Sequence, residues 1–297
     1  MAHTLLPIAL GIIMFGLGLS LTVEDFTRAA KHPRVVLIGL ATQIVVLPAI
    51  CFGLVLALNL HEAGDAGPYL AAGMMLLAAS PGGATAAMFS HLFRGDVALN
   101  ITLLAVNSVL SVFTLPIVVN LSLAFFLEGD QSIGLQVLDT LQVFAIVLIP
   151  AGIGMLVRHR WPGFAARMDK PVRIASVVIL AGVVVGALLS QGHEIWPHLG
   201  TIIGIAILFT LINLTIGYFL PRLMRVGKAQ AMAISMEIGV HNETLAITVG
   251  LSVLLEPRLA VPAATYSLVK FAIIPLFGLL ITRFAGRAAE AEPAVKG

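Results

Sequence analysis

The chain has 297 residues, of which 59% are hydrophobic and 11% are charged, and its mean hydropathy is +1.03. A soluble domain carries roughly 25% charged residues, so this composition excludes a water-soluble globular protein. The single cysteine, Cys51, lies inside an apolar run, which excludes disulfides and a thiol-ligated metal. The formal net charge of +2 gives no indication of a nucleic-acid partner.

Apolar segments recur along the whole chain, each close to the ~20 residues that a helix needs to cross a bilayer. The first has no Lys or Arg before it and further spans follow it, so we expect no cleaved signal peptide. Short polar connections with Gly, Pro, Asn and Asp separate the segments, as turns require. The nine predicted spans are 5–21, 35–58, 69–90, 97–123, 135–157, 174–189, 201–219, 231–254 and 261–281.

The connections alternate sharply in their content of Lys and Arg. Those after the even-numbered spans contain only Arg258. Cytoplasmic loops collect Lys and Arg, so we expect a multi-pass membrane protein whose N-terminus faces out and whose C-terminus faces the cytoplasm. The segments after the odd-numbered spans carry Arg28, Lys31, Arg34, Arg94, Arg158, Arg160, Arg167, Lys170, Arg173, Arg222, Arg225, Lys228, Arg283, Arg287 and Lys296.

The third span contains the sequence Ser80-Pro81-Gly82-Gly83 at its middle. Proline removes a backbone donor and clashes with the preceding helical turn. Two glycines weaken the helix further. The pattern predicts either a proline kink or a complete break of the helix.

The eighth span holds four polar residues, Glu237, His241, Asn242 and Glu243, in an otherwise apolar segment. A charge at the centre of a bilayer costs at least ~2.5–3.5 kcal/mol on the insertion scale. Two carboxylates so close together are therefore more consistent with a functional site than with packing.

The two interrupted spans occupy corresponding places in two three-span blocks, 35–123 and 201–281. The eighth span is the fifth after the third, and five is an odd number, so the blocks cross the membrane in opposite directions. This is the pattern of inverted repeats whose discontinuous helices meet near the midplane. Half-helix N-termini there favour an anion, while unwound carbonyls and the Glu237 carboxylate can coordinate Na⁺.

Other classes of protein lack support. There is no Gly-rich phosphate loop, zinc-ligand spacing or nucleophile elbow, which disfavours an ATP-driven pump and any cofactor. No repeated filter motif or ring of like charge indicates a channel. We expect one transmembrane domain over residues 1–290 and a disordered tail at 291–297.

Four stretches carry a resemblance to a known family: LGIIMFGLGLSL near the start, SPGGATAAMFSHLFRGDVALN, MEIGVHNETLA and AVPAATYSLVK. Over nearly its whole length the chain resembles bacterial members of the bile acid:sodium symporter family, in their nine-span form. The resemblance implies an all-α fold with a core domain at 35–123 and 201–281. It implies a panel domain at 5–21 and 135–189 that moves against the core in alternating access.

The resemblance also implies a sodium site. By position its ligands are Glu237, Gln43, the carbonyls of Ile238 and Val240, and His241, which stands where the family has glutamine. A ring nitrogen is a poor sodium ligand, so a backbone carbonyl is the alternative donor at this position.

A second sodium site of the family has lost most of its oxygen atoms in this sequence. Ala86, Ala87 and Leu104 stand where the family has oxygen-bearing side chains, which leaves Glu237 and Asn100 as donors. We therefore do not expect this site to bind sodium in the family manner.

Substrate contacts follow from the same resemblance. They involve Asn242 and the N–H groups that follow Gly83, at Ala84 and Thr85, with Glu243 adjacent. Lys270 lies deep in the ninth span, too far in for easy snorkelling to an interface. We hypothesise that it pairs with Glu243 or Glu237 and replaces the missing sodium charge.

The leading interpretation is sodium-coupled symport of a small organic anion. Proton-coupled or facilitative transport on the same fold is the runner-up, because the second site is degraded. A membrane enzyme is a remote alternative: Glu237 and His241 have the i, i+4 spacing of metal ligands, but a single histidine lies in this segment. A non-transporting sensor has no feature in its favour.

Overall fold

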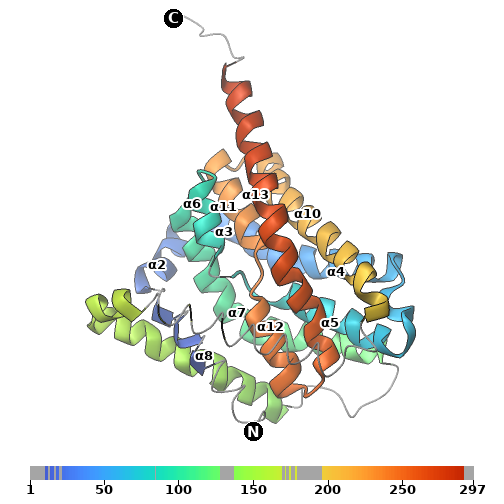
Figure 1. The fold of residues 1–297 in the computed structure, drawn as a ribbon. Helices are drawn as coiled ribbons and strands as arrows, with labels where there is room; N and C mark the ends of the chain where they lie inside the picture. Colours follow the sequence, from blue (N-terminus) through green and yellow to red (C-terminus); the bar gives the residue numbers. More distant parts are fainter. Residues whose placement is uncertain are drawn as a thin grey trace, which may run out of the picture.

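The computed structural model describes residues 22–83, 85–127, 137–168 and 196–290, with scattered positions at 11–19 and 171–178. Within these residues the regular structure is helical, apart from one backbone bridge (Figure 1). The predicted tail 291–297 and most of the predicted spans 5–21 and 174–189 lie outside this description.

The second predicted span forms one long helix with a local change of pitch. It is built from α3 (Pro33–Ala41), a π-helical turn η1 (Thr42–Val46) and α4 (Leu47–Ala57). Pro33 stands in the first turn of α3. Backbone N–H groups there have no acceptor within the helix, so a proline, which lacks this group, costs no hydrogen bond. The preceding helix α2 (Val23–Lys31) has acidic residues in its first turn and basic ones in its last, which matches the helix dipole.

The third and eighth predicted spans are each divided into two helices. The third consists of α5 (Gly67–Ala79) and α6 (Ala86–Leu92). The eighth consists of α11 (Lys228–Gly239) and α12 (Glu243–Thr248), followed by a π-helical turn η5 (Val249–Val253). The prediction of an interruption in both spans is therefore confirmed, and in the third it is a complete break.

The remaining long helices coincide with other predicted spans. They are α7 (Val97–Phe126), α8 (Val137–Arg160), α10 (Leu199–Leu223) and α13 (Val261–Glu290). Helix α13 continues past the predicted end at residue 281 because Ala, Arg and Glu, all good helix formers, follow. Short 3₁₀ turns are η2 (Leu60–Glu62), η3 (Gly64–Ala66), η4 (Trp196–His198) and η6 (Pro257–Ala260).

Four helices among the described residues are long and apolar enough to cross a membrane. They are Pro33–Ala57, Val97–Phe126, Leu199–Leu223 and Pro257–Arg283. The chain is thus an all-helical, polytopic membrane protein, while the count of nine spans stays a prediction.

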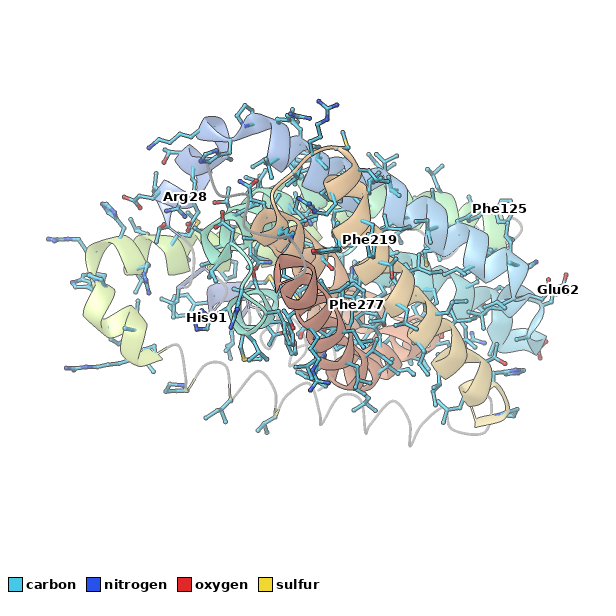
Figure 2. The ribbon with its side chains drawn as sticks, turned by 90° about the horizontal axis from the view of Figure 1, so that it is seen from above. Arg28, Glu62, His91, Phe125, Phe219 and Phe277 are labelled. Atoms are coloured by element: carbon cyan, nitrogen blue, oxygen red, sulfur yellow. The ribbon has the colours of Figure 1, made fainter. Side chains whose placement is uncertain are left out.

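Apolar side chains cover the outside of the spanning helices. Leu37, Leu121 and Leu268 are 64%, 67% and 75% exposed. Single exposed leucines are ordinary on any protein, but on helices of spanning length they present the surface that hydrocarbon chains require. Figure 2 shows Arg28 and His91 on one side of the molecule and Glu62 and Phe125 on the opposite side.

The two broken spans run antiparallel beside each other. Figure 1 shows α6 and α11 together in its upper part, and α5 and α12 together in its lower part. Helix α10 packs against α11 at Gly217, where an added Cβ would lie 2.8 Å from the Ser235 Cα. Glycine is therefore required here for the two helices to approach so closely.

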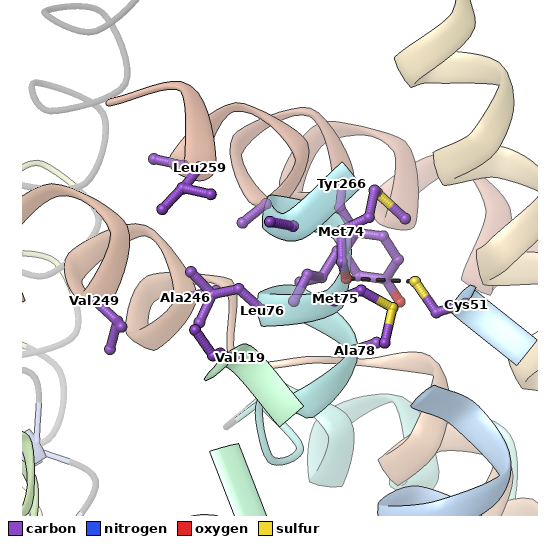
Figure 3. Packing of buried hydrophobic residues seen from close by; sticks show 14 of the residues in the cluster. Cys51, Met74, Met75, Leu76, Ala78, Val119, Ala246, Val249, Leu259 and Tyr266 are labelled. Atoms are coloured by element: carbon purple, nitrogen blue, oxygen red, sulfur yellow. Dashed lines mark hydrogen bonds between the residues drawn. The ribbon is translucent and has the colours of Figure 1, made fainter. Parts of the chain in front are cut away.

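A large apolar cluster fills the space between α5, α12 and the start of α13 (Figure 3). Cys51 is buried there as a free thiol, and its Sγ donates to the Met74 carbonyl over 3.4 Å. This packing fixes the lower halves of both broken spans and so holds the point where they cross.

Candidate functional site at the crossing of two broken helices

The first break follows from its proline. A residue before proline is disfavoured in the helical region, and Ser80 accordingly has φ −69° and ψ 146°. Helix α5 ends at Ala79, and the chain stays extended through Gly82 before α6 begins.

The second break contains no proline and ends differently. Val240, with φ −120° and ψ 89°, leaves the helical conformation directly after α11. Asn242 then caps α12, because its side-chain Oδ1 accepts a hydrogen bond from the Leu245 N–H over 3.0 Å. Asparagine is among the best N-cap residues, so this side chain starts the second half-helix.

The two breaks satisfy each other's backbone. The Gly83 N–H donates to the Val240 carbonyl over 2.5 Å, and the Asn242 N–H donates to the Pro81 carbonyl over 2.8 Å. These bonds form an antiparallel bridge between Gly82 and His241. Irregular backbone inside a membrane requires such internal partners, and here each broken span supplies them to the other.

The Glu237 side chain lies against the first break. An added Cβ on Gly82 would lie 1.9 Å from the Glu237 Oε1, so the carboxylate occupies the space that any larger residue would fill. Glu237 is 2% exposed, and neither carboxylate oxygen has a hydrogen-bond partner in the described part of the chain. A buried carboxylate without donors is unfavourable unless a cation is bound to it.

Two amide side chains beside the crossing also have unpaired oxygen atoms. Gln43, on the π-helical turn η1, donates from Nε2 to the Ser80 carbonyl over 3.2 Å, and its buried Oε1 has no partner among the residues that the structure describes. Asn100 donates from Nδ2 to the Ala233 carbonyl, one turn before Glu237, over 2.9 Å. Its Oδ1 is likewise buried without a partner. The region therefore has several buried oxygen atoms that lack donors, which is the ligand type that hard cations prefer.

His241 has both ring nitrogens in use. Its Nε2 lies 3.1 Å from the amide Nδ2 of Asn213, and its Nδ1 lies 3.4 Å from the Ser80 carbonyl. An amide N–H₂ donates and a carbonyl accepts, so both contacts are satisfied by a neutral ring with its proton on Nδ1. The ring nitrogens are thus engaged within the protein, which leaves the His241 backbone carbonyl as the donor this residue can offer to sodium.

Aromatic rings enclose His241 on two sides. The Phe209 ring stacks on it at a centroid distance of 5.4 Å, and the Tyr266 ring meets it edge-on at 5.5 Å. The Tyr266 hydroxyl donates to the Gly239 carbonyl over 2.6 Å, which satisfies the end of α11. Asn213 and these rings were not predicted, although Asn213 is a polar residue in the middle of an apolar span and could have been noticed.

The second carboxylate of the eighth span has a cation beside it. Lys270 Nζ forms an ion pair with Glu243 Oε1, while Glu243 Oε2 has no hydrogen-bond partner among the described residues. Lys270 is 2% exposed, and Glu243 is the first residue of α12. The pair thus joins α13 to the second half-helix.

The other predicted site residues lie close in sequence to the crossing but contribute less. Ile238 and Val240 are buried, and the Val240 carbonyl already accepts from Gly83. Thr85 is half-buried, and its hydroxyl has no partner among the described residues. Ala84 lies outside the described residues.

Ala86 and Leu104, at the predicted second sodium site, are buried among apolar side chains. Within the described residues no group of three or more His, Cys, Asp or Glu side chains could hold a metal ion. The chain also leaves the helix between Glu237 and His241, so these two do not share the face of one continuous helix.

Comparison with known proteins identifies the family. The model of the Sodium Bile acid symporter family matches residues 7–197. This chain belongs to that family. It is 29% identical over 265 residues to an uncharacterized sodium-dependent transporter, YocS, of Bacillus subtilis, with 88% of this chain and 78% of that protein covered.

Other members of the sodium bile acid symporter family are similar to nearly the same extent. A probable chloroplastic sodium/metabolite cotransporter, BASS2, of Oryza sativa is 28% identical over 267 residues. The match covers 88% of this chain but 59% of the rice protein. The ileal sodium/bile acid cotransporter of the rabbit, Oryctolagus cuniculus, is 25% identical over 248 residues, with 83% of this chain and 69% of that protein covered.

Proposed function

We propose that the chain is a secondary active transporter that carries a small organic anion across a bacterial inner membrane together with sodium. The observation that carries the proposal is the buried Glu237 carboxylate, whose oxygens lack partners in the described residues at the crossing of two broken helices. A bound cation removes the cost of burying this charge, and a cation that leaves during each cycle can couple its gradient to transport.

The names of relatives support sodium as the coupling ion. The bacterial relative is described as a sodium-dependent transporter and the rice relative as a sodium/metabolite cotransporter. A bovine relative, 25% identical over 240 residues, is described as a sodium-dependent organic anion transporter. All three names share sodium, and the bovine name adds an organic anion as the cargo.

The proposed machinery has nine spans with inverted repeats. Its core comprises residues 35–123 and 201–281, its panel 5–21 and 135–189, and relative movement of the two gives alternating access. The antiparallel course of the broken spans supports this arrangement, because inverted repeats cross the membrane in opposite directions.

We assign the proposed sodium ligands to oxygen atoms at the crossing. These are the Glu237 carboxylate, the Gln43 Oε1, backbone carbonyls at Ile238, Val240 and His241, and Asn100, which binds the Ala233 carbonyl one turn before Glu237. The anion would contact the backbone after the first break and the start of α12. The residues concerned are Gly83, Ala84, Thr85, Asn242 and Glu243.

Uptake into proteoliposomes tests the proposal. Radiolabelled carboxylates and sulfonates are presented under an inward sodium gradient or an equal choline gradient, with wild-type protein and with Glu237→Gln. We expect sodium to stimulate uptake of at least one anion and the variant to lose that stimulation. Equal uptake in sodium and choline for every anion, by active protein, would contradict sodium coupling.

Proton-coupled or facilitative transport is the second candidate. The observation in its favour is the ion pair of Lys270 and Glu243, which places an exchangeable proton donor beside the site. An inward proton gradient without sodium distinguishes the two, because it drives uptake only in the proton-coupled case.

A further inference from the structure

Lys270 is buried at the depth where a charge is most costly. It is the central residue of the spanning segment Pro257–Arg283 and is 2% exposed. A helix rises ~1.5 Å per residue, so either end of this segment lies farther away than the side chain extends. The ammonium cannot reach water at an interface and must be neutralised inside the protein.

Glu243 provides that neutralisation. Its Oε1 accepts directly from Lys270 Nζ. The Phe271 ring lies 5.3 Å from the ammonium and offers no negative charge. Because Glu243 begins α12 directly after the Asn242 cap, its position is fixed by the second break. The cation of the pair is therefore part of the crossing and does not dissociate.

The charges at the crossing can be counted. The nine predicted spans contain the charged residues Asp139, Glu237, Glu243 and Lys270, and Asp139 lies near the outer end of its span. His241 is neutral, because its Nε2 accepts from Asn213. The two glutamates and the lysine leave one net negative charge, located on the Glu237 carboxylate, whose oxygen atoms have no hydrogen-bond partner in the described part of the chain.

We propose that the Lys270 ammonium is a tethered cation that occupies the place of one coupling ion, so that the crossing binds a single mobile sodium ion, at Glu237. This inference rests on the proposed sodium-coupled transport and specifies its stoichiometry. One sodium ion neutralises the remaining charge, whereas a second would leave the buried site with a net positive charge.

The stoichiometry has a consequence for energetics. Lys270 moves with its helix in both directions and contributes no net charge movement over a complete cycle. One sodium ion and one monovalent anion enter together, so transport of a monoanion is electroneutral. Its accumulation follows the sodium concentration gradient and does not respond to membrane potential.

The test is the number of sodium ions bound per protein, measured with ²²Na⁺ at equilibrium. We compare wild type, Glu237→Gln, Lys270→Met and the double variant Lys270→Met/Glu243→Gln. Lys228→Met, at an exposed position on α11, is the matched control. We expect one bound ion in wild type, in the control and in the double variant, none in Glu237→Gln, and two in Lys270→Met.

The outcomes separate the two proposals. Two ions bound to wild type would contradict the proposal that Lys270 replaces one coupling ion, but would be consistent with sodium coupling. One ion that persists in Glu237→Gln would also overturn it. No bound ion in active wild-type protein would contradict the proposed function itself. If Lys270→Met does not fold, the double variant still tests the proposal. It keeps Glu237 but lacks the Glu243 carboxylate, so loss of its single ion would mean that sodium binds at Glu243.

Discussion

Two carboxylates on the second broken span, Glu237 fully buried and Glu243 largely buried, have opposite surroundings. Glu243 is paired with Lys270, whereas Glu237 lies against Gly82 with no described partner for either oxygen. A buried charge requires compensation in both cases. The comparison teaches that the compensating cation can be part of the protein at one carboxylate and exchangeable at the other, which is the difference between a structural pair and a coupling site.

Removal of the tethered cation alone should have the largest effect. Lys270→Met leaves Glu243 buried and unpaired, and we expect a loss of about 3–5 kcal/mol of stability. The double variant Lys270→Met/Glu243→Gln should recover most of this loss, because no charge remains unpaired. Thermal unfolding in choline buffer measures both. A single variant as stable as wild type would contradict the importance of the pair.

Displacement of the Glu237 carboxylate should have the second-largest effect. Gly82→Ala places a Cβ 1.9 Å from the Glu237 Oε1, and such overpacking costs about 1–3 kcal/mol. We expect the apparent sodium affinity, measured from sodium-dependent thermal stabilisation, to fall about tenfold. Gly204→Ala is the control, because an added Cβ there meets no atom within 4 Å. Unchanged sodium affinity in Gly82→Ala would argue against Glu237 as the ligand.

Removal of the hydrogen bond between Asn213 and His241 should have a smaller effect. Asn213→Leu removes the donor to the ring Nε2 and leaves a buried acceptor unsatisfied, at a cost of about 1–3 kcal/mol. We expect reduced stability and a several-fold weaker sodium affinity, since the ring also contacts Ser80 at the first break. Thr215→Val, an exposed position on the same helix, should leave both quantities unchanged. Equal stability and equal sodium affinity of the two variants would show that Asn213 does not support the sodium site.

An ion pair outside the crossing should have the smallest effect. Burial alone would raise the pKa of Glu256, but the hydrogen bonds and charge of Arg258 hold that pKa below its usual value of 4.5. A lowered folded-state pKa means that the carboxylate stabilises the fold above the unfolded pKa and loses this contribution as pH falls through the folded value.

Glu256→Gln should therefore cost less than about 1 kcal/mol at neutral pH. The difference from wild type should vanish as pH falls through the lowered folded-state pKa of Glu256, because the wild-type carboxylate is then protonated. Thermal unfolding of both proteins from pH 7 to pH 3 measures it. A difference in stability that grows on acidification would show that Arg258 does not lower the pKa of Glu256.

Much of the fold could be predicted because membrane helices follow from composition. Pro81 and its two glycines predicted the first break by local backbone chemistry, and the buried polar residues from Glu237 to Glu243 marked the second. The side-chain partners could not be predicted. Ser80 presents its carbonyl to both Gln43 and His241 only because the two spans cross, and this depends on contacts between segments distant in sequence.

Some features gave no signal in the sequence. The π-helical turn at Gln43 contains no proline or glycine itself; Pro48 follows in the first turn of α4, and a proline indicates a kink without specifying a π-helical turn. Asn242 was predicted as a substrate contact by resemblance, and the structure uses its Oδ1 to cap α12. A cap is recognised only when the residue at which the helix begins again is known, and the predicted interruption did not specify that residue.

The most direct test of the contrast between the two carboxylates is sodium-dependent thermal stabilisation of two variants. Glu237→Gln and Lys270→Met/Glu243→Gln are unfolded in sodium and in choline, because an ion that binds only the folded state raises the unfolding temperature. We expect sodium stabilisation to disappear in Glu237→Gln and to persist in the double variant. Persistence in Glu237→Gln together with loss in the double variant would contradict the account.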